Sequence, residues 1–296
     1  MPSAVVAQKR PDPRVLARPS GAYAMLAIDQ REALRKMLAD AEGRAMTDGD
    51  ITAFKLEVAR ALSPLASAIL LDNDFIWNQA IAQNAVAPSC ALIAAVDRFI
   101  GSSTEFVADV EIDEAVSPEC VRAQGAAALK LLVLHRPQES AEPRVAMVRR
   151  FVDICRQAGL VSIVEPVARG ARDGGAFDRD AGILAAAREL GDLGADLYKG
   201  EVPLNGRGDE KALRTACAAM TKAIASPWVV LSSGVEPDDF PRAVRLACAE
   251  GASGFLAGRA VWKPVIGRPD RGVALATDSA DRLRRLVDVA DQAVAG

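Results

Sequence analysis

A lysine stands inside an otherwise apolar, strand-like segment late in the chain. Lys199 lies in residues 195–203 (ADLYKGEVP), shortly after the turn-forming Gly191 and Gly194. A buried ammonium must be paired, reach solvent or give up its proton, and a neutral amine is what imine formation with a ketone or aldehyde requires. The structural alternative is a lysine whose ammonium reaches solvent from the end of a strand. Lys199 is therefore a candidate nucleophile for carbonyl chemistry.

Two further charged residues lie in or directly after apolar runs. Lys130 lies in the run ALKLL and could act as a second cation near Lys199, or pair with a carboxylate for structural reasons. Glu165 follows an apolar run and precedes Pro166, which we expect to end the strand and to fix where the carboxylate projects. That carboxylate could move protons while a carbinolamine forms and dehydrates, or form a salt bridge to either lysine.

Asp29 and His135 complete the acid–base candidates. Asp29 follows the apolar residues 25–28 and is either a second catalytic carboxylate or the N-cap of a helix that begins near Glu32. His135 is the one histidine of the sequence, and a lone loop histidine is more often structural or solvated than catalytic. Zinc-dependent carbon–carbon lyases draw most of their ligands from histidine, so the composition argues against a catalytic zinc. We expect neither a metal nor a cofactor.

Two consecutive strand-like runs end in residues that suit an anion. Ser232, Ser233 and Gly234 follow the first run, and Gly258 and Arg259 follow the second. Barrels often hold phosphate at their last two strand ends, through backbone N–H groups and a helix N-terminus. Glycine lets the backbone approach the anion, serine donates a hydrogen bond and arginine supplies a bidentate cation. A Ser-Gly pair alone is more often only a turn, but two such ends in succession favour a phosphate site.

The elements that must position these residues alternate between strands and helices. Short runs rich in Val, Ile and Leu predict strands at residues 23–28, 68–71, 90–96, 129–134, 161–164, 196–202, 228–231 and 254–257. Apolar residues at three and four spacing predict helices at residues 32–41, 51–62, 143–158, 180–193, 209–223 and 240–250. The third crossover, around residues 101–128, is less regular.

Eight strands in this alternation predict an α/β protein with a closed (β/α)₈ TIM barrel, and an open doubly wound sheet is the alternative. We expect one barrel domain at residues 21–296, preceded by an N-terminal extension at residues 1–20. No Gly-x-Gly-x-x-Gly follows the first strand and no P-loop is present, so nucleotide binding has no support. Because barrel active sites lie at the C-terminal ends of the strands, we expect the polar strand ends to share one cavity.

Composition limits the class of protein. The 296 residues can bury one full core, and 50% hydrophobic with 25% charged residues is ordinary for a globular chain. A formal net charge of −3 gives no case for nucleic acid or an anionic membrane as partner. Five widely spaced cysteines without a Cys-x-x-Cys pair indicate reduced thiols, and residues 1–20 lack a signal-peptide core. We expect a cytoplasmic homo-oligomer that acts on a small molecule.

Segments spread over nearly the whole chain after Gly21 resemble the bacterial sulfofructosephosphate aldolases. They are residues 24–32 (AMLAIDQRE), 62–70 (LSPLASAIL), 128–134 (ALKLLVL), 194–199 (GADLYK), 231–235 (LSSGV) and 251–262 (GASGFLAGRAVW). The related tagatose-1,6-bisphosphate aldolases share these positions less closely. Both are metal-free class I aldolases on a (β/α)₈ barrel, and the resemblance implies the same for this chain.

The resemblance also implies a role for each candidate residue. Lys199 would form the Schiff base, surrounded by the acid–base residues Asp29, Lys130 and Glu165. The phosphate of dihydroxyacetone phosphate would lie near Ser232, Ser233, Gly234, Gly258 and Arg259. Gln30 would contact the substrate, and Arg31 and Lys55 are candidates for binding its sulfonate. Lys55 would equally suit a solvated position on a helix.

The predicted activity is cleavage of 6-deoxy-6-sulfofructose 1-phosphate to dihydroxyacetone phosphate and 3-sulfolactaldehyde. Cleavage of tagatose or fructose 1,6-bisphosphate is the nearest alternative, because a phosphate dianion there replaces the sulfonate monoanion. A catalytically silent barrel that senses sugar phosphates is the alternative of another class. One residue departs from the pattern: Gly200 stands where we expect a larger apolar residue, which predicts loose packing beside Lys199.

Overall fold

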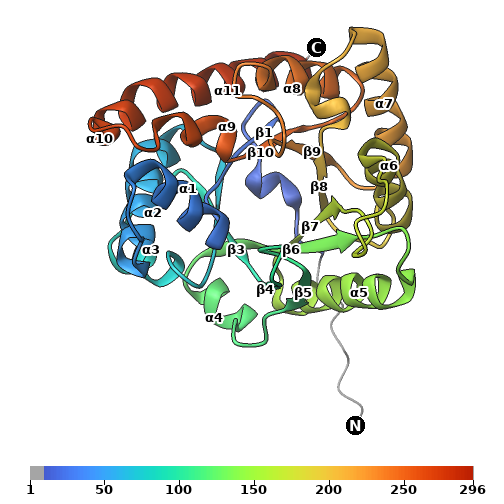
Figure 1. The fold of residues 1–296 in the computed structure, drawn as a ribbon, viewed down its shortest axis with the longest axis horizontal. Coiled ribbons are helices and arrows are strands. Elements are labelled where there is room, and N and C mark those ends of the chain that lie inside the picture. Colours follow the sequence, from blue (N-terminus) through green and yellow to red (C-terminus); the bar gives the residue numbers. More distant parts are fainter. Residues whose placement is uncertain (1–9, 296) are drawn as a thin grey trace.

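The computed structural model describes residues 10–295, and within them eight parallel strands close into a barrel ringed by helices (Figure 1). The strands are β1 (Tyr23–Ala27), β2 (Ala68–Leu71), β3 (Ala91–Ala95), β6 (Ala126–His135), β7 (Val161–Ala168), β8 (Leu197–Glu201), β9 (Trp228–Leu231) and β10 (Gly254–Ala257). Their order around the barrel is β1-β10-β9-β8-β7-β6-β3-β2. The predicted strands and the closed barrel are confirmed, and the open sheet is excluded.

Helices follow the strands and cover the outside of the barrel (Figure 1). They are α1 (Glu32–Glu42), α2 (Asp48–Leu62), α3 (Trp77–Ala82), α4 (Pro118–Ala123), α5 (Ala141–Ala158), α6 (Arg179–Leu190), α7 (Glu210–Ala223), α8 (Phe240–Ala249), α9 (Arg259–Trp262), α10 (Arg271–Ala274) and α11 (Ala280–Ala295). Helix α2 begins earlier than its apolar periodicity suggests, because Thr47 and Asp50 form a capping box there. No helix within residues 10–295 is long and apolar enough to cross a membrane.

The irregular third crossover contains a small antiparallel hairpin. Strands β4 (Asp97–Ile100) and β5 (Asp109–Ile112) pair with each other outside the barrel sheet, and α4 follows them. The hairpin begins two residues after β3 ends, so it leaves the barrel at the same end as the other strand termini. It forms part of the wall around the cavity described below.

Side chains alternate between the two faces of each barrel strand. On β1, Ala24 and Leu26 pack outward against the helices, whereas Tyr23 and Met25 belong to a separate cluster inside the barrel. Leu16, from the short 3₁₀ helix Pro13–Leu16, is fully buried in the same interior cluster. Leu16 and Ala17 of the predicted extension therefore help to fill the barrel, and residues 1–9 lie outside the described residues.

Pro166 does not end its strand, in contrast to our expectation. Strand β7 continues to Ala168 and stays paired with β6 through that residue. The N–H of Arg169 donates to His135 on β6, so by alternation the missing N–H of Pro166 faces β8, where the paired register ends at Val164. A proline is tolerated in a strand where its nitrogen has no ladder bond to make.

Candidate active site

Strand periodicity places the candidate residues in one layer inside the barrel. Ala128, Ile163 and Leu197 belong to the interior apolar cluster, each on a different strand. Lys130, Glu165 and Lys199 follow them by two residues, so they point to the same interior face, one layer closer to the C-terminal ends of the strands. The sequence thus brings three distant charged residues together above an apolar floor.

Lys130 is fully buried and contacts several of the charged residues that cluster inside the barrel. Within the described residues its Nζ contacts three carboxylates, at 2.6 Å from Asp29, 2.7 Å from Asp97 and 3.0 Å from Glu165. Burial favours the neutral amine, but these three carboxylates outweigh it and raise the pKa of Lys130 well above its usual value. Lys130 is therefore a fixed cation.

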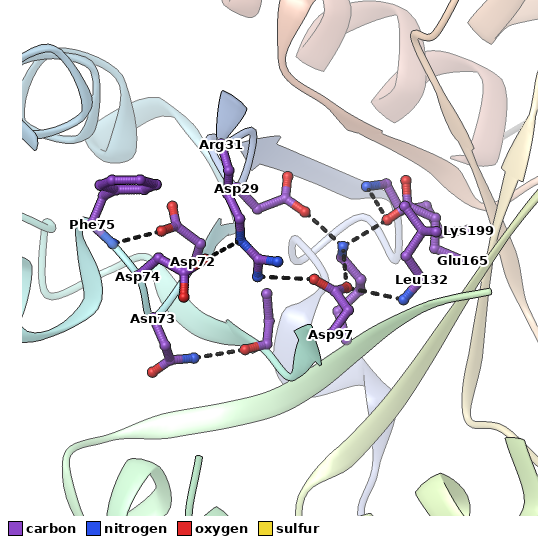
Figure 2. A network of polar contacts seen from close by, with 12 residues as sticks. Asp29, Arg31, Asp72, Asn73, Asp74, Phe75, Asp97, Leu132, Glu165 and Lys199 are labelled. Atoms are coloured by element: carbon purple, nitrogen blue, oxygen red, sulfur yellow. Dashed lines mark hydrogen bonds and ion pairs between the residues drawn. The ribbon is translucent and has the colours of Figure 1, made fainter. Parts of the chain in front are cut away.

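Lys199 reaches the same cluster from β8 but has fewer partners. Its Nζ lies 2.9 Å from Glu165 Oε2, and this is its one ion pair among residues 10–295. Figure 2 shows Lys199 and Glu165 side by side at the edge of the cluster. Both residues line the cavity, whereas Lys130 does not. A substrate carbonyl in the cavity can therefore meet the amine of Lys199 with a carboxylate beside it.

Asp29 lies at the end of β1 and also lines the cavity. Burial disfavours its charge, but the ammonium groups of Lys130 and Lys199 hold the pKa of Asp29 well below its usual range. A carboxylate with such a low pKa is a weak base, which favours a role as a fixed negative charge over a role as proton carrier. Asp29 is not the N-cap of α1, because that position is occupied by Arg31.

Asp97 is the member of the cluster that we did not predict. Its carboxylate accepts hydrogen bonds from Lys130 (2.7 Å), from Arg31 (3.0 Å) and from the backbone N–H of Leu132 (3.0 Å). It is fully buried and does not line the cavity, so it acts on the site through its two cations. The signal was present in the sequence, since Asp97 follows the interior residue Ala95 by two.

A cavity of about 700 Å³ opens above this cluster at the C-terminal ends of the strands. Its wall combines strand ends with the β4–β5 hairpin, and it includes Gln30, Leu132, Ser102 and Phe106. The carbonyl oxygen Oε1 of Gln30 is buried and has no hydrogen-bond partner among the described residues. This volume is sufficient for a phosphorylated six-carbon sugar.

The ends of β9 and β10 form a polar corner of the cavity. Arg259 Nη2 donates to Ser233 Oγ at 2.8 Å, and the N–H of Ala260 donates to Ser232 Oγ at 3.4 Å. Burial lowers the pKa of the Arg259 guanidinium, and Arg259 has no ion pair within the described part of the chain. The predicted anion-binding residues Ser232, Ser233, Gly258 and Arg259 all line the cavity. Gly234 follows in a left-handed conformation with φ 76° and does not line it.

The two candidate sulfonate ligands, Arg31 and Lys55, are both paired with carboxylates. Arg31 lines the cavity, but its guanidinium lies 2.7 Å from Asp74 and 3.0 Å from Asp97, so two carboxylates already neutralise it. Lys55 is fully buried on α2, forms an ion pair with Asp72 and is absent from the cavity wall. It is therefore not a solvated helix residue, and in this structure it does not face the cavity in which we expect the substrate.

His135 and Gly200 have structural explanations. His135 is buried outside the cavity with Nε2 3.4 Å from Glu189, and burial lowers its pKa. Gly200 is packed closely, in contrast to our expectation of loose packing. A Cβ at Gly200 would lie 3.2 Å from the ring of Tyr198 and 3.4 Å from Met220, so neighbouring side chains already fill the space beside Lys199.

Comparison with known proteins finds a matching family and several related aldolases. A family model described as DeoC/LacD family aldolase matches residues 23–264. The tagatose 1,6-diphosphate aldolase of Listeria monocytogenes serotype 4a (strain HCC23) is 28% identical over 271 residues, which cover 83% of this chain and 79% of that protein. Tagatose 1,6-diphosphate aldolase 1 of Enterococcus faecalis (strain ATCC 700802 / V583) is 29% identical over 278 residues, covering 86% and 84%.

Two solved structures have a similar fold. An archaeal fructose 1,6-bisphosphate aldolase superposes with a TM-score of 0.64 at 18% identity, covering 94% of this chain and 97% of that one. The fructose-bisphosphate aldolase of Plasmodium falciparum superposes with a TM-score of 0.67 at 13% identity, covering 98% and 97%. At these identities the likeness establishes the barrel fold.

Proposed function

The chain belongs to the DeoC/LacD family of class I aldolases, and from that premise we propose that it cleaves 6-deoxy-6-sulfofructose 1-phosphate to dihydroxyacetone phosphate and 3-sulfolactaldehyde. Lys199 would be the Schiff-base lysine. One observation carries this assignment: the amine of Lys199 meets the cavity with a single carboxylate, Glu165, 2.9 Å away. Membership of an aldolase family favours an enzyme over a catalytically silent sensor.

In the proposed reaction, the neutral amine of Lys199 attacks the C2 ketone and forms a carbinolamine. Loss of water from C2 leaves a protonated imine, and Glu165 is placed to give a proton to the departing hydroxyl and to take one back. The C3–C4 bond then breaks, its electron pair moves into the imine to form an enamine, and a base takes the proton of the C4 hydroxyl. Protonation of C3 and hydrolysis of the imine release dihydroxyacetone phosphate and restore Lys199.

The surrounding charges fit these steps. Lys130 keeps Glu165 and Asp29 in place through contacts of 3.0 Å and 2.6 Å, so the carboxylate beside Lys199 does not need to move far during proton transfer. Ser233 and Arg259 form the corner in which we place the C1 phosphate, where a guanidinium without a carboxylate partner can bind an anion bidentately. The C2 carbonyl would then lie between this corner and Glu165.

Tagatose 1,6-bisphosphate cleavage is the second candidate function, because both curated relatives described above are named tagatose 1,6-diphosphate aldolases. The two reactions use the same chemistry at C2 to C4 and differ in the group at C6, a sulfonate monoanion or a phosphate dianion. The sulfonate proposal is supported by the six segments that resemble the sulfofructosephosphate aldolases more closely.

Comparison of kcat/KM on three substrates tests the proposal. The substrates are 6-deoxy-6-sulfofructose 1-phosphate, tagatose 1,6-bisphosphate and fructose 1,6-bisphosphate, each measured with and without EDTA. We expect the sulfonate substrate to be preferred and EDTA to have no effect. A preparation of Lys199→Met, made in parallel, controls for contaminating aldolases. A preference for either bisphosphate would overturn the substrate assignment, and loss of activity with EDTA would overturn the metal-free mechanism.

A further inference from the structure

Two arginines on the cavity wall have no carboxylate partner among residues 10–295. Among the described residues Arg31, Arg98 and Lys199 also line the cavity, but each of them forms an ion pair. Arg169 and Arg259 form no ion pair with any residue that the structure describes. The guanidinium of Arg169 donates from Nη1 to the carbonyl oxygen of Ala168 at 3.2 Å, which leaves most of its donors unused. An arginine held in a cavity without a counter-ion is suited to bind an anionic group of a ligand.

The two arginines stand on opposite sides of Lys199. Arg259 follows β10 and Arg169 follows β7, and β8, which carries Lys199, lies between them with β9 in the barrel order. The two guanidinium groups share one cavity, and after burial the charge of Arg169 is among the causes that lower the pKa of Arg259. Within residues 10–295, the cavity therefore has one cation without an ion pair on each side of the proposed nucleophile.

A chain of hydrogen bonds fixes the separation of the two positions. The carboxylate of Glu201 accepts from the N–H of Ala168 at 2.7 Å and from Arg179 at 2.9 Å. Arg179 also reaches the carbonyl oxygen of Ser233 at 3.5 Å, and the hydroxyl of Ser233 accepts from Arg259. The backbone beside Arg169 is thus connected to the polar corner at Ser233 through the buried carboxylate of Glu201 and the partly exposed guanidinium of Arg179.

The loop after β7 is also held from its other side. The N–H of Arg169 donates to the carbonyl oxygen of His135 at 2.9 Å, and Arg136 donates to the carbonyl oxygen of Gly170 at 2.5 Å. Arg136 is itself ion-paired with Glu105 of the β4–β5 connection at 2.6 Å. The position of Arg169 is therefore set by the barrel and by the hairpin, which suits a residue that must meet a ligand at a defined distance.

We propose that Arg169 binds the terminal anion of the substrate, the sulfonate or phosphate on the carbon farthest from C1. This inference rests on the proposed function. With the C1 phosphate at Arg259 and C2 at Lys199, we place carbons C3 to C6 away from β9 and β10, toward β7 and the hairpin, where Val167, Arg169 and Phe106 line the cavity. Arg169 is the free cation on that side of the cavity, in the described part of the chain. The site then has one arginine for each charged end of the substrate.

The reverse reaction, aldol condensation, tests the two ends of the site separately. Dihydroxyacetone phosphate supplies the C1 phosphate, and the aldehyde supplies the terminal anion. We would measure kcat/KM for dihydroxyacetone phosphate with three aldehydes: 3-sulfolactaldehyde, glyceraldehyde 3-phosphate and uncharged glyceraldehyde. For Arg169→Ala we expect a fall of about 30- to 300-fold with both anionic aldehydes and a change of less than about 3-fold with glyceraldehyde. The KM for dihydroxyacetone phosphate should remain unchanged.

Arg259→Ala is the matched control for the other end. It should weaken all three reactions by a similar factor, because dihydroxyacetone phosphate is common to them. Arg169→Lys keeps the charge and should recover part of the loss with the anionic aldehydes. Thermal unfolding and borohydride trapping of dihydroxyacetone phosphate on Arg169→Ala verify that the barrel and Lys199 are intact.

The outcomes distinguish this inference from the proposed function. An equal loss with all three aldehydes for Arg169→Ala would place Arg169 at the C1 phosphate, and no loss with any of them would remove it from the site; either result overturns the inference. The choice between sulfonate and phosphate is decided separately, by the preference of the unmodified enzyme. A preference for glyceraldehyde 3-phosphate with the same selective loss in Arg169→Ala would refute the substrate assignment and retain Arg169.

Discussion

The two lysines inside the barrel are buried to a similar degree but differ in their surroundings. Lys130 on β6 is 0% exposed and contacts Asp29, Asp97 and Glu165, whereas Lys199 on β8 is 3% exposed and contacts Glu165. Burial alone penalises both ammonium groups. The three carboxylates around Lys130 raise its pKa and make it a permanent cation, and the smaller number of partners around Lys199 is consistent with its proposed role as nucleophile.

Glu165 connects the two lysines. Because its carboxylate contacts both Nζ atoms, it would remain paired with Lys130 while Lys199 formed the proposed imine. The cluster can thus change charge at Lys199 without leaving a buried carboxylate unpaired. Substitution of each lysine by methionine, which has a similar length and no charge, separates these two roles.

The largest expected effect is on activity, in Lys199→Met. Without an amine the proposed imine cannot form, so kcat/KM should fall by at least about 10⁴-fold. The free energy of unfolding should change by less than about 1 kcal/mol, because Glu165 keeps Lys130 as its partner. Urea unfolding and steady-state kinetics on the same preparation measure both quantities. Activity within 100-fold of the unmodified enzyme would remove Lys199 from the reaction.

Lys130→Met should mainly reduce stability. It removes the cation shared by three buried carboxylates, which we expect to cost about 3 to 5 kcal/mol of the free energy of unfolding at pH 7. Urea unfolding beside Lys199→Met gives the direct contrast. If Lys130→Met and Lys199→Met had equal free energies of unfolding, the additional carboxylate contacts of Lys130 would not contribute to stability, which would contradict this prediction.

The stability difference between the unmodified protein and Lys130→Met should depend on pH. In the unmodified protein the pKa of Asp29 is depressed, so its contribution to stability is complete above its unfolded pKa of about 4 and is lost only as pH falls below that value. In Lys130→Met burial is no longer offset by Lys130, so the pKa of Asp29 rises and protonation stabilises the folded variant. The stability gap between the two proteins should therefore narrow between pH 7.5 and pH 5. A constant gap would contradict the charge-pairing explanation.

Asp97→Asn tests the positioning of Lys130 with a smaller change. The amide keeps the shape of the side chain but removes the charge between Lys130 and Arg31. Because Asp97 does not line the cavity, we expect kcat to fall about 10- to 100-fold while KM changes by less than about 3-fold. Rate–pH profiles should also shift, which a purely structural role would not cause. An increase in KM alone would contradict the positioning role.

The smallest effect on activity is expected for a third buried lysine. Lys55 pairs with Asp72 outside the cavity wall, so Lys55→Met should lose stability but retain kcat/KM within about 3-fold, assayed at a temperature where it is folded. This variant therefore tests whether the loss of any buried lysine reduces activity, or only the loss of one in the proposed active site. A selective loss of activity with the sulfonate substrate would restore Lys55 as a sulfonate ligand.

These residues also show what the sequence could and could not predict. Lys130, Glu165 and Lys199 could be predicted from the sequence because each interrupts an apolar strand. The strand period of two then determines which face of the strand each side chain occupies. Pro166 was misread, because whether a proline ends a strand depends on which neighbour its nitrogen faces, and that is a property of the sheet.

The sequence also could not predict which charged residues form ion pairs with each other. Lys55 and Arg31 were assigned to the substrate because the sequence cannot tell which carboxylate meets which cation across the barrel. Arg169 was missed for the complementary reason: among so many arginines, the absence of a partner becomes visible only once the described ion pairs are known. Charged residues could therefore be placed on elements from sequence, but not sorted into paired and free.

Covalent trapping tests the central assignment most directly. The protein is incubated with dihydroxyacetone phosphate, reduced with sodium borohydride and digested, and the modified peptide is identified by mass spectrometry, with Lys199→Met and Lys130→Met treated in parallel. We predict one reduced adduct on the Lys199 peptide, which is absent in Lys199→Met and retained in whatever fraction of Lys130→Met is folded. An adduct on Lys130 or on another lysine, or none in the unmodified protein at saturating dihydroxyacetone phosphate, would contradict the account.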